Sequence, residues 1–286
     1  MPRWPRLAEV GSSRRPDWPL AVVVGAGGMG MAIARRLGQT HRVLLADRDA
    51  DHLDRQSRQL EVEGLDVAVI TCDVTDRGDL VRLAETARTA GPVKSLAYVV
   101  GLSPSAGDFR QIMSVNLIGA ASAVASFGEV LVPGGAALLI SSSSAHMQAA
   151  APEILALVDR PLDPDFLSQI ESLLGDAATP AAAYVASKKG VIRLCQALAA
   201  AWGTKGLRIL SLSPGLVATP MGAREYAKSP GKLRLFETVP AAREGTMLEI
   251  ANVADFLLSS SASYISGTDI LVDGGLIATL GSRQFD

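Results

Sequence analysis

The 286-residue sequence contains few side chains that bind metals or form disulfides. Its two cysteines, Cys72 and Cys195, lie in apolar segments. They predict small buried side chains in a reducing compartment, which fits a cytoplasmic protein and excludes a disulfide framework. The histidines, at positions 41, 52 and 146, lack the spacing of metal ligands, so we expect no metal site.

The sequence also lacks a strong charge of either sign and a long uninterrupted apolar run. A formal net charge of −2 gives no reason to expect nucleic acid as a partner. The longest apolar stretch, 117–140, is interrupted by Glu129 and by Pro-Gly-Gly at 133–135. It predicts a buried helix followed by a strand, so we expect no membrane span. Residues 1–19 are basic and contain prolines but no apolar signal-peptide core, and we expect a flexible N-terminal extension.

Apolar residues are abundant, at 48% of the chain, and their pattern predicts a parallel sheet. Short apolar runs alternate with segments of helical periodicity, such as 29–37 and 185–202. Unbroken apolar strands are typical of sheets covered by helices on both faces. We therefore predict an α/β fold over residues 20–281: a single domain with a Rossmann-type, doubly wound, mainly parallel seven-stranded sheet. The expected strands are Ala21–Val24, Arg42–Ala46, Val67–Cys72, Ser95–Val100, Ala136–Ser141, Arg208–Ser213 and Asp269–Val272.

The first predicted strand leads into a glycine-rich turn, VVVGAGGMG at 22–30. Gly25, Gly27 and Gly30 form the pattern G-x-G-x-x-G, which also contains Met29. Glycines at this spacing let the backbone approach a pyrophosphate, whose charge then lies at the N-terminus of the next helix. The alternative is a tight strand-to-helix turn without a ligand.

An acidic residue stands where a dinucleotide site would need one. Asp47 ends the second predicted strand, 22 positions after Gly25. A carboxylate there accepts hydrogen bonds from the ribose hydroxyls of adenosine and repels a 2′-phosphate, which favours NAD over NADP. Arg48 is adjacent and could instead contact a phosphate.

Three further segments contain candidate catalytic side chains. Tyr184 and Lys188 are four positions apart on a predicted helix, so they share a face. A cation there would stabilise the phenolate, although an exposed helix face gives the same pattern. Ser142 lies in a run of four serines after a strand, at the sheet edge where ligands bind. Asn116, in an apolar helical segment, is either a proton-relay residue or a satisfied core amide.

Together these motifs resemble those of the short-chain dehydrogenase/reductase family, in the family's order, over nearly all of residues 20–276. CDVTD at 72–76 matches the segment that contacts adenine, and LSPGLVATPM at 212–221 matches the segment that closes over the nicotinamide. The resemblance implies a catalytic set of Asn116, Ser142, Tyr184 and Lys188. It implies cofactor contacts at Gly25, Gly27, Met29, Gly30, Asp47, Asp73, Val74, Val100, Gly101, Tyr184, Lys188, Pro214, Gly215, Val217 and Thr219.

The resemblance implies an NAD-dependent oxidoreductase that interconverts a secondary alcohol and a ketone. Tyr184 would be the general acid or base, Ser142 would polarise the substrate oxygen, and Lys188 would bind ribose and stabilise the phenolate. Asn116 would support a water path to Lys188. The segment SYISGTDILVDGG at 263–275 matches a strand that often builds subunit contacts, so a homodimer or homotetramer is expected. The alternative function is a non-catalytic NAD-binding sensor, although a sensor need not keep these four side chains.

Three features depart from the family pattern. The glycine loop is one residue shorter than usual and has Val24 where threonine is usual. The family's NNAG is replaced by YVVG at 98–101, without amide side chains. Ser142 and Tyr184 are 42 positions apart, which indicates an insert at about 147–180. The insert predicts two short amphipathic helices, one of them capped by Asp163.

The insert and the variable segment 221–245 are expected to shape the substrate site. Both ends of the insert are anchored at catalytic elements, so we expect it near the substrate mouth. It is either a lid or wall for a bulky apolar substrate, of the hydroxysteroid, terpenoid or carbonyl-compound type, or a surface that contacts or blocks another subunit. The charged side chains of 221–245 are accounted for by a solvated surface.

Overall fold

The computed structural model describes residues 15–223 and 230–282. Its centre is one seven-stranded sheet in the order β3-β2-β1-β4-β5-β6-β7, and all neighbouring strands are parallel. The chain starts in the middle, builds one edge and then returns to build the other, so the predicted doubly wound sheet is confirmed and is wholly parallel. The strands are β1 Leu20–Val24, β2 Arg42–Asp47, β3 Val67–Thr71, β4 Val93–Tyr98, β5 Leu131–Ile140, β6 Arg208–Pro214 and β7 Asp269–Val272.

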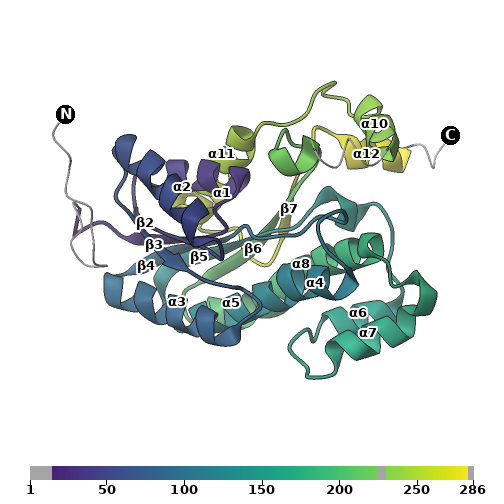
Figure 1. Cartoon of the computed structure of the whole chain (residues 1–286), viewed down its shortest axis with the longest axis horizontal. Coiled ribbons are helices and arrows are strands. Elements are labelled where there is room, and N and C mark those ends of the chain that lie inside the picture. The colour runs from purple at the N-terminus through teal and green to yellow at the C-terminus, as the bar shows by residue number, and fades with distance from the viewer. Residues whose placement is uncertain (1–14, 224–229, 283–286) are drawn as a thin grey trace.

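Helices cover both faces of the sheet (Figure 1). Helices α1, α2 and α11 lie on one face, and α3, α4, α5 and α8 lie on the other. No helix within the described ranges is long and apolar enough to cross a membrane. The helices are α1 Gly28–Leu37, α2 Ala50–Val62, α3 Arg77–Ala90, α4 Phe109–Met113, α5 Gly119–Phe127, α6 Pro152–Val158, α7 Phe166–Leu174, α8 Pro180–Gly203, α10 Pro230–Glu237, α11 Met247–Leu258 and α12 Leu276–Ser282. A π-helix, η1 Ser114–Ile118, and three short 3-10 helices, η2 Ser143–His146, η3 Gly175–Ala177 and η4 Ser260–Ala262, complete them.

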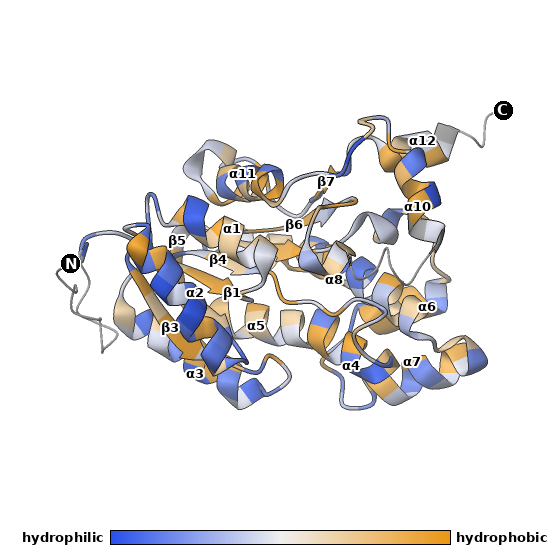
Figure 2. Cartoon of the chain, turned by 45° about the horizontal axis from the view of Figure 1, so that its top comes forward, coloured by the Kyte–Doolittle hydropathy of each residue, from blue (hydrophilic) through white to orange (hydrophobic). Residues whose placement is uncertain are grey.

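The buried residues form two apolar layers, one on each face of the sheet. In β1, Val22 and Val24 belong to one layer, whereas Ala21 and Val23 belong to the other. This alternation follows from the two-residue period of a strand, and it explains why the sequence of β1 is apolar at every position. Figure 2 shows the same feature as strands that are hydrophobic along their length.

Strand β5 begins earlier than the sequence indicates. Leu131 pairs with Val93, and pairing then resumes with Ala136 opposite Ser95 after a shift in register. The Pro-Gly-Gly segment 133–135 forms the bulge between the two pairings, where Gly134 has a φ of +80°. The predicted start at Ala136 was therefore wrong, because a bulge accommodates the turn residues inside the strand.

The insert forms the two predicted helices, α6 and α7, but they do not cover the sheet edge where ligands bind. They pack beside α4 and α8 on the lower side of the view (Figure 1). Phe166 and Ile170 are 2% and 0% exposed and join the apolar layer on that face. The helix α7 begins at Phe166 after Asp165, so the predicted cap at Asp163 was wrong; the Asp163 carbonyl instead accepts a turn hydrogen bond from Phe166 N.

The last residues of the predicted extension, 15–19, contact the sheet where β2 and β3 begin. The backbone N–H of Arg15 donates to Asp66, and the carbonyl of Trp18 accepts a hydrogen bond from the buried Arg42 side chain. The remainder of the predicted flexible extension, 1–14, lies outside the described residues. Positions 224–229 of the variable segment 221–245 also lie outside them.

Candidate active site

A cavity of about 640 Å³ opens at the carboxyl ends of the strands. Its walls come from the glycine loop after β1, the serine run after β5, the start of α8 and the segment after β6. The segments after β1, β5 and β6 leave the same end of a parallel sheet, so their polar groups converge there. From the insert 147–180, only Met147 belongs to the wall among the described residues. The expectation that the insert lies at the substrate mouth is therefore not met by α6 and α7.

The glycine loop has the geometry of an anion cradle. Gly25 has a φ of +109°, a conformation that favours glycine. A Cβ on Gly30 would stand 1.8 Å from the carbonyl oxygen of Gly25, so the helix can approach the strand only with glycine there. Gly27 is the N-cap of α1, and nothing lies within 4 Å of the position its Cβ would take. The loop thus presents open space at a helix N-terminus, which fits a pyrophosphate.

The carboxylate of Asp47 reaches back to this loop. Its Oδ2 accepts a hydrogen bond of 2.8 Å from the backbone N–H of Ala26, and its Oδ1 accepts one of 3.2 Å from Asp49 N. Each oxygen retains a lone pair for a further donor. The side chain is half-buried at the end of β2, as predicted, although it is not part of the cavity wall.

Lys188 lies in the floor of the cavity, on α8. Its Nζ donates a hydrogen bond of 2.8 Å to the carbonyl of Ile140, at the end of β5. The side chain is 4% exposed, and this burial lowers the pKa of Lys188 to about 8 because desolvation disfavours the ammonium form. The ammonium is 5.9 Å from the centre of the Tyr184 ring, so the predicted neighbours on one helix face do meet in the cavity.

The four serines after β5 have different environments. Ser141 donates its hydroxyl to the carbonyl of Lys188, which ties β5 to α8. The Oγ of Ser142 accepts two hydrogen bonds from Ser144, one from the N–H at 3.2 Å and one from the hydroxyl at 3.1 Å. Both lone pairs of the Ser142 oxygen are then engaged, so its own hydroxyl proton is left to donate.

The turn that carries these serines, η2, is also fixed at its far end. The Nε2 of His146 lies 2.8 Å from Asp269 Oδ2 in β7 and 3.3 Å from the hydroxyl of Ser213 in β6. The carboxylate of Asp269 also accepts a hydrogen bond of 2.6 Å from Ser211. The position of Ser142 is thus set by contacts to two strands beyond its own.

Asn116 lies behind the cavity wall and not in it. Its amide is held by the backbone of Leu102, with 2.7 Å to the N–H and 3.0 Å to the carbonyl, and it donates to Ser187 Oγ at 3.3 Å. A Cβ on Gly101 would stand 3.5 Å from Asn116 Oδ1 and 3.2 Å from Lys188 Nζ. The amide therefore fixes the loop that passes over the lysine, as expected of a satisfied core amide, and its role in a proton relay stays a prediction.

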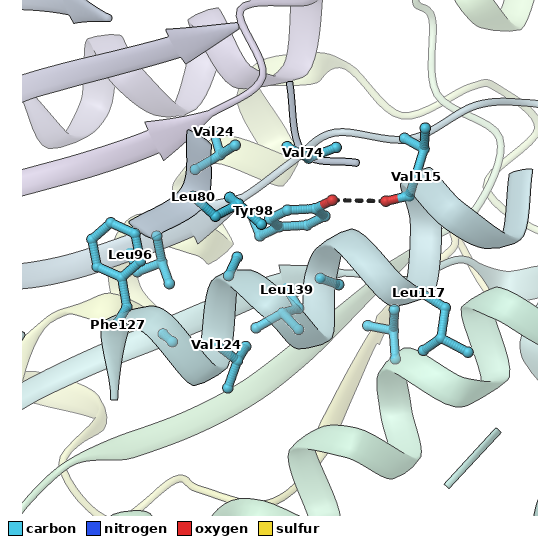
Figure 3. Packing of buried hydrophobic residues seen from close by; sticks show 14 of the residues in the cluster. Val24, Val74, Leu80, Leu96, Tyr98, Val115, Leu117, Val124, Phe127 and Leu139 are labelled. Atoms are coloured by element: carbon cyan, nitrogen blue, oxygen red, sulfur yellow. Dashed lines mark hydrogen bonds between the residues drawn. The ribbon is translucent and has the colours of Figure 1, made fainter. Parts of the chain in front are cut away.

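Asn116 is the middle residue of a five-residue π-helix, η1, between α4 and α5. Such a bulge was not predicted, because it has no sequence signature here. The hydroxyl of Tyr98, at the end of β4, donates a 2.7 Å hydrogen bond to the carbonyl of Val115 in this π-helix (Figure 3). Gly119 makes room for that hydroxyl, since a Cβ there would stand 2.6 Å from it. Tyr98 thus links β4 to the π-helix at the position where YVVG replaces the amides.

The predicted cofactor contacts fall into two groups. Those in the cavity wall are Gly25, Gly27, Met29, Gly30, Gly101, Tyr184, Lys188, Pro214, Gly215, Val217 and Thr219. Those outside it are Asp47, Asp73, Val74 and Val100. Val100 packs directly on Gly25, whereas the carboxylate of Asp73 accepts hydrogen bonds from Thr75.

Several wall residues were not predicted from the sequence. Hydroxyl groups come from Ser103 and Ser144, and apolar surface comes from Met147, Met221 and Leu235. None of them was singled out as a site residue: Ser144 stands in the serine run, and Met147, Met221 and Leu235 stand in segments expected to shape the substrate site. The wall also includes His52 of α2, a histidine that spacing alone left without a role.

Comparison with known proteins identifies the family. A profile described as short chain dehydrogenase matches residues 19–153, and one described as Enoyl-(Acyl carrier protein) reductase matches residues 169–277. Short-chain dehydrogenase/reductase bsc3 from Alternaria brassicicola is 34% identical over 263 residues, covering 91% of this chain and 96% of the relative. The chain belongs to the short-chain dehydrogenase/reductase family.

Other members of the family are similar along most of their length. Galactitol 2-dehydrogenase (L-tagatose-forming) from Cereibacter sphaeroides is 35% identical over 275 residues, covering 91% of this chain and 96% of that protein. The structure of an actinorhodin polyketide ketoreductase variant with NADPH has a TM-score of 0.72 and 25% identity, covering 91% and 98% of the two chains. As a short-chain dehydrogenase/reductase, this chain is an oxidoreductase that acts on CH–OH groups with NAD(P).

Proposed function

We propose that this short-chain dehydrogenase/reductase uses NAD to interconvert an apolar secondary alcohol and its ketone. The observation that carries the proposal is the arrangement at the cavity floor, where Ser142, Tyr184 and Lys188 meet beside the open glycine loop. When bound, the nicotinamide cofactor supplies or accepts the hydride.

Tyr184 is the proposed proton donor for ketone reduction and the base for alcohol oxidation. The Lys188 ammonium, 5.9 Å from the ring centre, stabilises the phenolate that remains after the proton leaves. Ser142 would hold the substrate oxygen, because its hydroxyl proton is left to donate once Ser144 occupies its lone pairs. A donor aimed at that oxygen stabilises negative charge as it develops. Asn116 supports the same floor by fixing the loop over Lys188.

The preference for NAD rests on Asp47. Its carboxylate stands beside the glycine loop and keeps lone pairs for ribose hydroxyls, whereas it would repel a 2′-phosphate. Gly25, Gly27 and Gly30 would receive the pyrophosphate, and the segment Pro214–Thr219 would cover the nicotinamide. The ketoreductase named above was solved with NADPH, so the two cofactors must be compared directly on this chain.

The substrate class is inferred from the far side of the cavity. Met147, Met221, Leu216 and Leu235 provide apolar surface around the proposed reacting centre, and methionines adapt readily to ligand shape. A hydroxysteroid, terpenoid or similar carbonyl compound fits such walls. One relative acts on galactitol by its name, so a polyol is the competing class.

We also propose that the protein forms a homodimer or homotetramer through the edge strand β7. Among the described strands β7 is paired only with β6, at the end of the sheet, and an edge strand of this kind suits association. Leu271 in β7 and the nearby Tyr264 are exposed apolar or aromatic side chains. Light scattering coupled to size-exclusion chromatography tests this proposal, and a monomer at micromolar concentration would contradict it.

A substrate screen tests the function. Purified protein is assayed at 340 nm with NAD(H) and NADP(H), each with steroid and terpenoid ketones and alcohols and with sugar alcohols. We expect turnover of apolar ketones or alcohols, with a higher kcat/KM for NAD(H). A preference for NADP(H) would contradict the role of Asp47, and turnover of sugar alcohols alone would contradict the substrate class. Cofactor binding without turnover of any compound would favour the sensor.

A further inference from the structure

Two side chains hold consecutive peptide groups of the glycine loop in place. The N–H of Ala26 donates to Asp47 Oδ2 at 2.8 Å, and the carbonyl of Ala26 lies 2.9 Å from His52 Nε2. The carbonyl can only accept, so Nε2 must carry the hydrogen and donate it. His52 itself is anchored in the first turn of α2, where its backbone N–H donates to the capping side chain of Asp49.

The second of these peptide groups contains a candidate ligand donor. The Ala26 carbonyl and the Gly27 N–H belong to one peptide, and the described chain has no cis bonds, so the two groups point in opposite directions. While His52 holds the carbonyl toward α2, the Gly27 N–H points away from α2. That N–H has no partner within residues 15–223 and 230–282, and Gly27 belongs to the cavity wall.

Without the hydrogen bond to His52, the 26–27 peptide could rotate to the opposite orientation. A flip of the 26–27 peptide changes the φ of Gly27 from −70° to about +110°, which a glycine tolerates. Gly27 has no side chain, and nothing lies within 4 Å of the position that its Cβ would take. In the flipped state a carbonyl oxygen would replace the N–H and would repel an anion.

We propose that His52 is a positioning residue for the nucleotide. It holds the Ala26 carbonyl so that the Gly27 N–H faces the pyrophosphate of the cofactor. The inference rests on the proposed function, because it assumes a nucleotide diphosphate at the N-terminus of α1. It assigns a task to a histidine that belongs to none of the sequence motifs.

The test compares two substitutions of His52 by direct binding. NADH is titrated by its fluorescence, and ADP, which has the same diphosphate without nicotinamide, is titrated by calorimetry. His52→Leu removes the hydrogen-bond donor and keeps apolar bulk, and we expect it to weaken both ligands about tenfold. His52→Gln places an amide N–H near the same carbonyl, and we expect it to restore both affinities to within about threefold of the unmodified protein.

A control separates positioning from helix stability. Gln59→Ala changes an exposed side chain on α2, away from the cavity wall, and should leave both affinities unchanged. Affinities of His52→Leu within twofold of the unmodified protein would overturn the inference, and so would equal losses in the Leu and Gln variants. If the unmodified protein bound neither NADH nor ADP, the proposed function itself would be contradicted, and the inference with it.

Discussion

The hydroxyl of Tyr98 donates a 2.7 Å hydrogen bond to the carbonyl of Val115, one residue before Asn116 in the π-helix. The phenol is 1% exposed, and burial raises the pKa of Tyr98 well above its ordinary value, so it is a neutral donor at any working pH. A buried aromatic side chain thus connects the central sheet to the segment that fixes the cavity floor. This contact lies at 98–101, where the sequence has YVVG in place of the family's amide side chains.

Tyr98→Phe should destabilise the protein while leaving its shape intact. The substitution keeps the ring but leaves the buried Val115 carbonyl without this donor, at a cost of about 1–3 kcal/mol. Urea denaturation measures the loss. Tyr264→Phe removes the hydroxyl of an exposed tyrosine and should change the free energy of unfolding by less than about 0.5 kcal/mol. Equal effects of the two substitutions would show that the Tyr98 hydroxyl does not contribute.

Ser144→Ala should slow turnover without abolishing it. The Ser142 oxygen would keep the N–H of residue 144 and lose the hydroxyl donor, so its proton would be less firmly directed to the substrate. We expect kcat to fall about three- to tenfold, less than in Ser142→Ala. Ser144→Thr retains a hydroxyl and should recover most of the rate. An unchanged kcat in Ser144→Ala would remove Ser144 from this account.

The stability of the protein should depend on the titration of Lys188. Burial lowers the pKa of this lysine from 10.5 to about 8 in the folded chain. Between these values the unfolded chain keeps a proton that the folded chain has released, so stability rises with pH, by at most about 1.4 kcal/mol per pH unit. Below about pH 8 Lys188 is protonated in both the folded and the unfolded chain. The full cost of burying its charge then lowers the free energy of unfolding.

This dependence is measured against Lys188→Met, which cannot titrate. Urea denaturation at pH 7, 8, 9 and 10 gives the free energy of unfolding for both proteins. We expect the unmodified protein to gain stability relative to the variant above about pH 8. A difference that stays constant over this range would show that the lysine has an ordinary pKa.

The insert should behave as part of the core. Phe166→Ala empties a site in the apolar layer that is 2% exposed, and we expect a loss of about 3–5 kcal/mol. Leu162→Ala, in the same insert but 49% exposed, should cost less than about 1 kcal/mol. NADH affinity should be the same in both variants, because α6 and α7 contribute nothing to the described cavity wall. Weakened NADH binding in Phe166→Ala would indicate that the insert supports the site.

The fold could be predicted because its signals are local and repeated. Seven apolar runs and one glycine loop indicated a doubly wound, seven-stranded parallel sheet, which the structure confirms, and Asp47 and Lys188 were found by their spacing. The strand boundary at Leu131 was missed because the bulge depends on pairing with a distant strand. Asp163 was chosen as a cap by its following proline, yet the helix starts only where Phe166 can enter the core.

Contacts between distant segments could not be predicted from the sequence. Nothing near His52 indicates that it reaches Ala26, 26 positions earlier, and the bond from Tyr98 to Val115 depends on an unpredicted π-helix. The placement of the insert was also open, because its apolar stripe fits a lid or wall for the substrate as well as a surface that contacts or blocks another subunit. In the structure Ile170 instead packs into the apolar layer of this chain.

The central claim is that Tyr184 transfers the proton while other residues hold the cofactor. Tyr184→Phe tests it most directly, with turnover of the best substrate measured beside NADH affinity by fluorescence titration. The account predicts a loss of kcat of at least about 100-fold, with the Kd for NADH within about threefold of the unmodified protein. Retained turnover in this variant would contradict the account.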